Sequence, residues 1–385
     1  MSKTRLALVA NNVHFRGGME RYCAELVHRL CEEYDVHIFA IEVDDVPKDK
    51  VSIHLVPCAK RPTLLLVTQF FANSSRMVRY KDYDIVHTIG GITARQNFVT
   101  AQYCQAGWGD TIRREPALAE VGMTPYHHFM WRFAAYLENR TMNSPDTRNI
   151  SACSQKTKDE LHKFYGTDLS KITVIHNAVD PVRFTPENVR YRSEVRKKYG
   201  IDDKAIIVLF VGEFRRKGLA TVIRALGLIK DPNVYLLAVG KGNRAAYQAI
   251  ADSVGVGDRI ILADPERQVE RIFGAADIFA FPTFYEPFGM VVTEAMATGL
   301  PVITSVNAGA SEVIQDGKNG FLVQRPSDAD EMSKQLRMLI SDAGLRKSAG
   351  ELARETAASH DWDTVARETT RLYRSQSPSP AQPVA

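Results

Sequence analysis

The chain has few cysteines and lacks any long hydrophobic run. Its 385 residues include five cysteines, and none of them forms a Cys-x-x-Cys pair. Cysteines that are scattered and odd in number are typical of a protein from a reducing compartment and not of a disulfide-stabilised secreted protein. No run approaches the roughly 18 apolar residues of a membrane span, and the first residues form no secretory signal with a cleavage site. These absences predict a cytoplasmic protein.

Strong net charge and clustered metal ligands are also missing. The formal net charge is +4, and no dense basic run is interleaved with aromatic residues, so nucleic acid is not an expected partner. Two Asp-x-Asp patterns, at 82–84 and 361–363, stand at the start of an expected strand and of an expected helix, where a parallel sheet does not bind ligands. The adjacent His127 and His128 point to different sides of any helix. We therefore expect no bound metal.

Short β-branched apolar runs alternate with helical patterns along the whole chain, as in parallel sheets with crossover helices. The expected strands are 6–10, 36–41, 51–56, 84–89, 98–102, 149–153 and 172–175, then 205–212, 234–240, 259–263, 277–282, 301–304 and 320–323. The rhythm pauses near residue 178 and resumes after an expected polar helix at 187–199. The length suits two domains, which we place at 1–178 and 179–360. An amphipathic helix at 361–374 follows, and the Ser- and Pro-rich tail 375–385 is expected to be disordered.

Two glutamates bracket the start of an expected helix in the second domain. The sequence reads EPFGMVVTE from Glu286 to Glu294 and continues as AMATGLPVI. A buried strand precedes it, so 287–289 forms the strand-to-helix turn, whose unpaired N–H groups suit phosphate or sugar hydroxyls. The alternative is a solvated loop acid followed by an ordinary helix acid. The whole stretch resembles the E-x7-E signature of retaining glycosyltransferases of family 4, which have the GT-B fold.

The resemblance implies an α/β architecture of two Rossmann-like domains that face each other across a cleft. The first would bind the acceptor and the second the nucleotide sugar, and the C-terminal helix would cross back to pack on the first. Glu286 would contact hydroxyls of the donor sugar, and Glu294 would contact the ribose of its nucleotide. The donor would also meet the backbone amides of three residues at the turn, Phe288, Gly289 and Met290.

A basic loop, GEFRRKG at 212–218, lies between a buried strand and the expected helix 219–226. Arginine and lysine together stabilise a departing diphosphate without a metal, so Arg216 and Lys217 are the chosen residues, with Arg215 as a further candidate. The alternative is a solvated basic turn. The commonest family pattern has Arg where Glu213 stands. The Arg-Lys-Gly version here resembles lipopolysaccharide-core glucosyltransferases.

Gly17 and Gly18 follow the first expected strand and open the first helix. They do not form G-x-G-x-x-G, so a dinucleotide site has little support. A plain turn is one interpretation. Family 4 enzymes, however, place such a Gly-Gly loop over the donor diphosphate, and the resemblance makes both glycines donor-binding candidates.

The acceptor side departs from the family pattern. Many members carry a histidine after the strand that corresponds to 98–101, whereas this chain has Gln102 and Tyr103 there. Either residue is a candidate for that polar position. His87 is the nearest alternative, although a histidine satisfied within the core explains it better.

Two apolar segments, 62–72 and 126–140, fit ordinary core packing or contact with a membrane surface. The first is bracketed by four basic residues, Lys60, Arg61, Arg76 and Arg79. As a hypothesis, this edge of the first domain makes a peripheral contact with the anionic cytoplasmic face of the inner membrane.

The function predicted by this resemblance is retaining transfer of a hexose from a nucleoside diphosphate sugar, with a UDP-sugar favoured, to a hydroxyl of a cell-envelope glycan or lipid-linked acceptor, as in lipopolysaccharide biosynthesis. A β-phosphate oxygen would take the acceptor proton, which agrees with the lack of an obvious protein base. No cofactor is expected. Two rivals are a GT-B nucleotide-sugar 2-epimerase and a non-catalytic nucleotide-sugar-binding protein.

Overall fold

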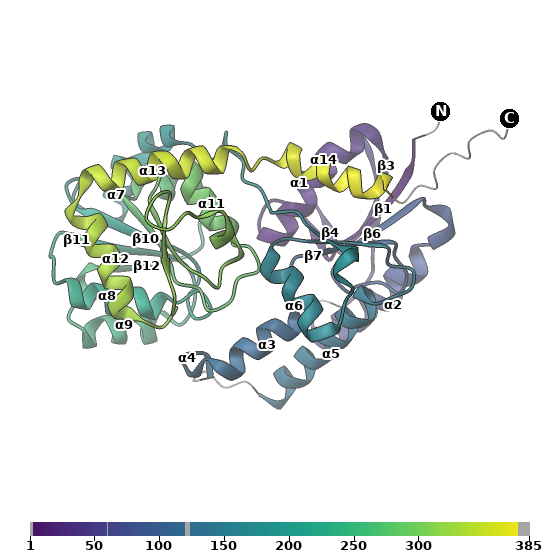
Figure 1. Ribbon diagram of the computed structural model, residues 1–385, viewed down its shortest axis with the longest axis horizontal. Coiled ribbons are helices and arrows are strands. Elements are labelled where there is room, and N and C mark those ends of the chain that lie inside the picture. The colour runs from purple at the N-terminus through teal and green to yellow at the C-terminus, as the bar shows by residue number, and fades with distance from the viewer. Residues whose placement is uncertain (1–2, 60, 120–123, 376–385) are drawn as a thin grey trace. The chain divides into compact units, whose positions relative to one another are not determined.

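The computed structural model describes residues 3–59, 61–119 and 124–375 (Figure 1). The chain divides into two compact units, the first of 1–110, 122–177 and 362–385 and the second of 111–121 and 178–361. The short segment 111–121 groups with the second unit, which the sequence did not indicate. The tail beyond Ser375, where disorder was expected, lies outside the described residues, as does Lys60.

The first unit is built on a parallel sheet of seven strands. Their order is β5(Val51–Leu55), β3(Asp35–Ala40), β1(Arg5–Val9), β6(Ile85–Ile89), β7(Phe98–Ala101), β8(Asn149–Ala152) and β9(Ile172–Val174). A small parallel pair joins β2(Asn12–Val13) to β4(Glu42–Val43). The helices of this part of the chain are α1(Gly18–Glu33), α2(Thr63–Met77), α3(Gln105–Arg114), α4(Pro116–Ala119), α5(Pro125–Met142) and α6(Gln155–Tyr165).

The second unit has a parallel sheet of six strands. Their order is β12(Ile260–Ala263), β11(Val234–Lys241), β10(Ile206–Glu213), β13(Ile278–Phe281), β14(Val302–Ser305) and β15(Phe321–Val323). The main helices are α7(Arg192–Tyr199), α8(Leu219–Ile229), α9(Arg244–Ser253), α10(Val269–Ala275), α11(Met290–Ala297), α12(Ala329–Ser341) and α13(Ala343–Ala358). The strand order reverses between β10 and β13, and the loops that leave such a reversal form the usual ligand crevice of an open α/β sheet.

Both faces of the second sheet are covered. Val208 and Phe210 of β10 pack with α8 and α12, which lie side by side (Figure 1). The alternate residues Ile207 and Leu209 are buried as well, on the opposite face. Burial on both faces explains the continuous apolar strands of the sequence, because parallel sheets covered by crossover helices lose the alternation of polar and apolar residues.

The polar helix expected at 187–199 is in fact two elements. A 3₁₀ helix, η3(Pro186–Tyr191), precedes α7, and it lies so close to α10 that a Cβ at Gly274 would be 2.1 Å from the Asn188 carbonyl oxygen. Arg196 of α7 is fully buried, forms a 2.7 Å ion pair with Asp277, and donates to the carbonyl oxygens of Asp202 and Ala205. A buried, fully engaged guanidinium thus joins a charged helix to the sheet.

The last helix, α14(Trp362–Arg374), belongs to the first unit, which confirms the predicted crossing back of the C-terminal segment. The Tyr373 hydroxyl lies 2.6 Å from His87 Nδ1, and its ring meets the Phe98 ring edge-on. Trp362 packs edge-on against Tyr22 at 5.9 Å between ring centroids. Of the described helices, none is both long enough and apolar enough to cross a membrane.

Candidate active site

The candidate site of the second unit is formed by the loops that leave β10 and β13. The β10 loop, 214–218, leads into α8, and the β13 loop, 282–289, leads into α11. Because β10 and β13 are neighbours in one parallel sheet, their loops leave the same edge side by side. The Arg216–Lys217 pair and Glu286, which are almost 70 residues apart in the sequence, therefore come together.

The β10 loop is a tight turn held by Glu213. Its carboxylate accepts hydrogen bonds from the Arg215 amide at 3.0 Å and the Arg216 amide at 2.8 Å. Gly218 closes the turn with a φ of +83°, and a Cβ there would lie 2.1 Å from the Pro282 carbonyl oxygen. Glu213 therefore shapes the basic loop, and the glycine at 218 allows the basic loop to approach the β13 loop.

Two cations converge on one oxygen of Glu286. Lys217 Nζ forms a direct ion pair with Glu286 Oε2, and Arg216 Nη1 lies 3.3 Å from the same oxygen. Arg216 Nη1 also donates to the Tyr285 carbonyl oxygen at 2.8 Å. The side chains of Lys217 and Glu286 are each 13% exposed. A lysine carries three donor hydrogens and an arginine five, so both cations keep donor capacity for an incoming anion.

The electrostatic setting of Lys217 combines burial with opposite and like charge. Burial lowers the pKa of the Lys217 ammonium group, the Glu286 carboxylate opposes this, and the Arg216 guanidinium adds to the lowering. The Lys217 ammonium also lies 4.8 Å from the centroid of the Phe281 ring. Charge in such a partly dehydrated setting acts more strongly on a phosphate than it would in water.

The β13 loop ends at an N-terminus of α11 that no side chain caps. Gly289 is the N-cap residue, with a φ of +97°. The preceding turn is fastened to the loop before the 3₁₀ helix η5(Gly309–Val313), because the carbonyl oxygens of Glu286 and Phe288 accept from the amides of Gly309 and Ala310. Glu294 lies one turn into α11, on the same face as Met290, and is 5% exposed. The arrangement suits the predicted donor contacts.

The Gly17–Gly18 loop belongs to the first unit, where Gly17 is the N-cap residue of α1. A Cβ at Gly17 would lie 2.2 Å from a carboxylate oxygen of Glu20, which is the flexible end of a side chain that can move aside. The loop is tied to the β4 region, since Arg16 forms ion pairs with Glu42 and Asp44. The donor contact predicted for both glycines stays a prediction.

The three acceptor-side candidates have different surroundings in the structure. Gln102 and Asn177 exchange two side-chain hydrogen bonds, of 2.9 and 2.7 Å. Tyr103, which directly follows Gln102, is half-buried. His87 as an acceptor residue is wrong. Its ring is fully buried and held by Tyr373 at Nδ1 and by Thr100 at Nε2, 2.7 Å away, and burial lowers its pKa to about 3. His87 is a neutral core histidine.

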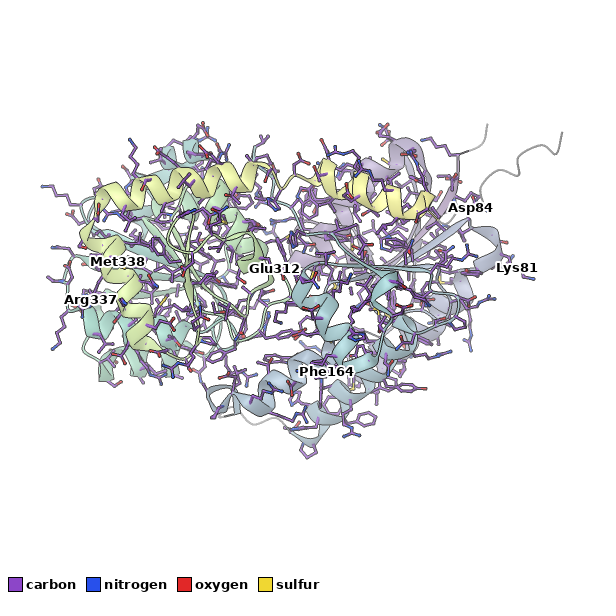
Figure 2. All side chains as sticks on the ribbon, viewed as in Figure 1. Lys81, Asp84, Phe164, Glu312, Arg337 and Met338 are labelled. Carbon is purple, nitrogen blue, oxygen red and sulfur yellow. The ribbon has the colours of Figure 1, made fainter. Side chains whose placement is uncertain are left out.

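The Asp-x-Asp patterns at 82–84 and 361–363 have structural roles. Asp84 stands just before β6, where Figure 2 labels it, and its carboxylate accepts from the Arg5 amide at 2.8 Å. Asp363 forms an ion pair with Arg29 of α1 at 2.5 Å. His127 forms a capping box with Thr124 at the start of α5. Within the described ranges, no group of three His, Cys, Asp or Glu side chains is placed to hold a metal ion.

Two side chains of the basic loop have roles that are not apparent from the sequence. Arg215 Nη1 donates to the Leu118 carbonyl oxygen at 3.2 Å, so this guanidinium is engaged with the segment 111–121 of the same unit. In the sequence, Glu213 is distinctive only because the commonest family pattern has an arginine at its position. Asp, Asn, Ser and Thr are the residues whose side chains commonly bond the amides that follow them, so a glutamate at 213 did not signal this turn.

Gly218→Ala is expected to displace the basic loop and to weaken nucleotide binding at least tenfold, since the new Cβ would collide with the Pro282 carbonyl oxygen. Gly317→Ala is the matched control: Gly317 has a similar φ of +76° but has no atom within 4 Å of the added Cβ. Both variants carry the backbone strain of about 1 kcal/mol, but only Gly218→Ala should lose binding in calorimetry. Equal binding by the two variants would refute the role of Gly218.

Two family models match the chain over most of its length. The model of "Glycosyltransferase Family 4" matches residues 16–183, and that of "Glycosyl transferases group 1" matches residues 192–356. The uncharacterized glycosyltransferase MJ1607 of Methanocaldococcus jannaschii is 27% identical over 93% of this chain and 94% of its own. Lipopolysaccharide glucosyltransferase WaaG of Escherichia coli is also 27% identical, over 66% of this chain and 69% of its own.

Solved structures agree on the architecture. A crystal structure of WaaG gives a TM-score of 0.79 at 21% identity and covers 96% of this chain and 99% of that one. Anabaena HepE in complex with UDP and glucose gives 0.73 at 18% identity, covering 97% and 100%. Likeness at this identity concerns the fold, and the family models add the chemistry class. The chain therefore belongs to the glycosyltransferases of family 4, with a group 1 glycosyltransferase part over its second half and the GT-B fold.

Proposed function

We propose that the protein moves a hexose from a nucleoside diphosphate sugar, with a UDP-sugar favoured, to a hydroxyl of a cell-envelope glycan or lipid-linked acceptor, with retention at the anomeric carbon. The observation that carries the proposal is the convergence of Arg216 and Lys217 on Glu286, beside the uncapped N-terminus of α11. Cations and helix amides in one place fit a diphosphate, and a carboxylate beside them fits sugar hydroxyls.

In the proposed mechanism, the donor diphosphate displaces part of the Glu286 ion pair and takes up the remaining donor hydrogens of Arg216 and Lys217. These cations then stabilise the charge that develops as the bond from sugar to phosphate breaks. Glu286 orients the sugar, and Glu294 holds the ribose. The acceptor hydroxyl attacks from the face of the leaving group, and a β-phosphate oxygen takes its proton. No cofactor or metal has a role in this proposal.

The relatives support parts of this assignment. The names of WaaG and of the D-inositol 3-phosphate glycosyltransferase of Corynebacterium jeikeium, 28% identical over 77% of this chain, describe sugar transfer to different acceptors. The HepE complexes with UDP and UDP-glucose support a UDP-sugar donor. The lipopolysaccharide role of WaaG favours a cell-envelope acceptor and hence a protein that works in the cytoplasm.

A thermal-shift screen against UDP, GDP and ADP and their sugars tests the donor. A ligand at 100 times its Kd stabilises the folded protein by about 2.7 kcal/mol, so the true nucleotide should raise Tm while the others do not. Release of UDP that depends on an added acceptor then identifies transfer. Donor turnover that needs neither acceptor nor water would point to the 2-epimerase, and binding without any turnover would point to a sensor.

We also propose a peripheral membrane contact at α2. Of its residues only Phe70 and Ser74 are buried, Leu65 is 40% exposed, and the exposed Arg76 and Arg79 are at its end. Anionic liposomes should recover the wild type more efficiently than the Arg76→Ala/Arg79→Ala double variant. A surface change in the second unit, Arg337→Ala/Lys347→Ala, serves as the control. Equal recovery of all three would refute the contact.

A further inference from the structure

A carboxylate outside the candidate donor site is buried where three helices meet. Glu138 of α5 is 5% exposed, and its Oε2 accepts hydrogen bonds from the Gln105 amide and the Tyr165 hydroxyl, both at 2.7 Å. The Tyr165 hydroxyl itself accepts from the Ala106 amide at 3.2 Å. Side chains of α5 and α6 therefore hold the first two amides of α3, groups that have no partner within their own helix. Figure 1 shows the three helices together.

Glycines allow α3 to lie unusually close to these partners. A Cβ at Gly107 would be 2.6 Å from the Glu160 carboxylate, and one at Gly109 would be 1.8 Å from the Trp131 ring. The Trp131 indole N–H donates to the Gln105 carbonyl oxygen. The start of α3 is thus fixed through its amides, a carbonyl oxygen and its small-residue face. Loosening it requires breaking several contacts at once.

The segment that this arrangement fixes is the one assigned to the acceptor. Residues 102–104 connect the carboxyl end of β7 directly to α3, and Gln102 is tied at the other side to Asn177. We propose that Glu138 is a positioning residue, which holds the acceptor-side segment 102–104 in place through the first turn of α3, and that its protonation makes this hold pH-dependent. Calling the segment acceptor-side rests on the proposed function; the hold itself does not.

The groups around Glu138 explain the pH dependence. Its two hydrogen-bond partners are an amide and a hydroxyl instead of a cation. Lys156 of α6 is engaged with Glu160 at 2.9 Å, and the Cys104 thiol before α3 is buried. Burial raises the pKa of Glu138 to about 7, the bonds from Tyr165 and Gln105 act against this, and the charge of Glu160 adds to it.

The sign follows from proton binding. When the segment opens and Glu138 meets water, its pKa returns to about 4.3, so the closed form binds the proton more tightly. Glu138 therefore stabilises the closed form of the segment most when the pH is below the pKa of the water-exposed carboxyl group. This stabilisation decreases as the pH rises toward 7, and above pH 7 it no longer changes. A proton on Oε1 leaves Oε2 free to accept both hydrogen bonds, so the neutral form keeps the contacts.

Hydrogen exchange of the full chain, followed by mass spectrometry on peptides covering 102–108, tests the proposal. After correction for intrinsic exchange, wild-type protection should fall roughly tenfold between pH 5.5 and 7.5. Glu138→Gln keeps an oxygen acceptor and does not titrate, so its protection should be independent of pH. Glu138→Ala should exchange at least tenfold faster at both pH values, and Glu351→Gln, an exposed carboxylate of the second unit, should behave as wild type.

The proposal would be overturned if protection of the wild type did not change with pH. It would also be overturned if the peptides of Glu138→Ala exchanged at the wild-type rate. If Glu138→Ala does not fold, Tyr165→Phe takes its place, with several-fold faster exchange at 102–108 expected and no change counting against the hold. Stabilisation by UDP, measured on the same samples, separates the two claims. A wild type that fails to bind any nucleotide defeats the proposed function, whereas the exchange pattern alone decides the role of Glu138.

Discussion

Lys217→Ala is expected to lower sugar transfer by about 100- to 1,000-fold, the usual effect of removing one group that stabilises transition-state charge. Glu286→Ala is expected to lower it by about 100-fold or more, because the donor sugar loses the group that orients it. Lys217 is the most direct ion-pair partner of Glu286, and its loss leaves that carboxylate with Arg216 at 3.3 Å. Acceptor-dependent release of UDP from a panel of UDP-sugars measures the effect. Substantial activity in either variant would contradict the site.

Nucleotide binding should distinguish the two residues. Because Glu286 is assigned to the sugar, Glu286→Ala should bind UDP within a few-fold of wild type, whereas Lys217→Ala should bind it markedly less well. Lys347→Ala is the matched lysine control, since the Lys347 side chain of α13 is 79% exposed and its ion pair with Glu351 is long, at 3.9 Å. That variant should transfer sugar at the wild-type rate. Circular dichroism should show the same fold in all three proteins.

Deletion of α14 is expected to unfold the first unit and leave the second folded. The helix buries six side chains within the first unit: Trp362, Val365, Ala366, Thr369, Thr370 and Tyr373. Each large apolar side chain removed from water contributes about 1.5–3 kcal/mol, so the loss is about 5 kcal/mol or more. This equals much or all of the stability of a typical domain. Urea denaturation of a chain ending at Asp361 should therefore lack the first unit's cooperative transition.

Two further variants make the deletion experiment specific. A chain that ends at Ser375 keeps all of α14 and should unfold as the full chain does. Tyr373→Phe removes only the hydroxyl at His87 Nδ1, and should cost about 1–3 kcal/mol because a buried ring nitrogen loses its partner. A chain ending at Asp361 that retains two transitions would show that the first unit does not depend on α14.

The strands and the helix after Glu286 were predictable because their signals are local. Apolar runs such as 207–210 and 278–281 are buried on both faces, and Gly289 and Gly218 mark turns that need a positive φ. The pairing of Lys217 with Glu286 was not predictable from spacing, because it depends on which strands are neighbours. Likewise, nothing near Arg196 in the sequence shows that Asp277 will neutralise it. The sequence around His87 does not distinguish a histidine that binds a ligand from one that packs in the core.

The placement of α14 also bears on the order in which the protein folds during synthesis. Residues 178–361 make up nearly all of the second unit, and they leave the ribosome before Trp362 and Tyr373, which the core of the first unit requires. The first half of the chain therefore emerges early but completes its core last. Until then the surface around Tyr22, Phe98 and His87 that α14 will cover is exposed, a state that favours capture by chaperones or association between nascent chains.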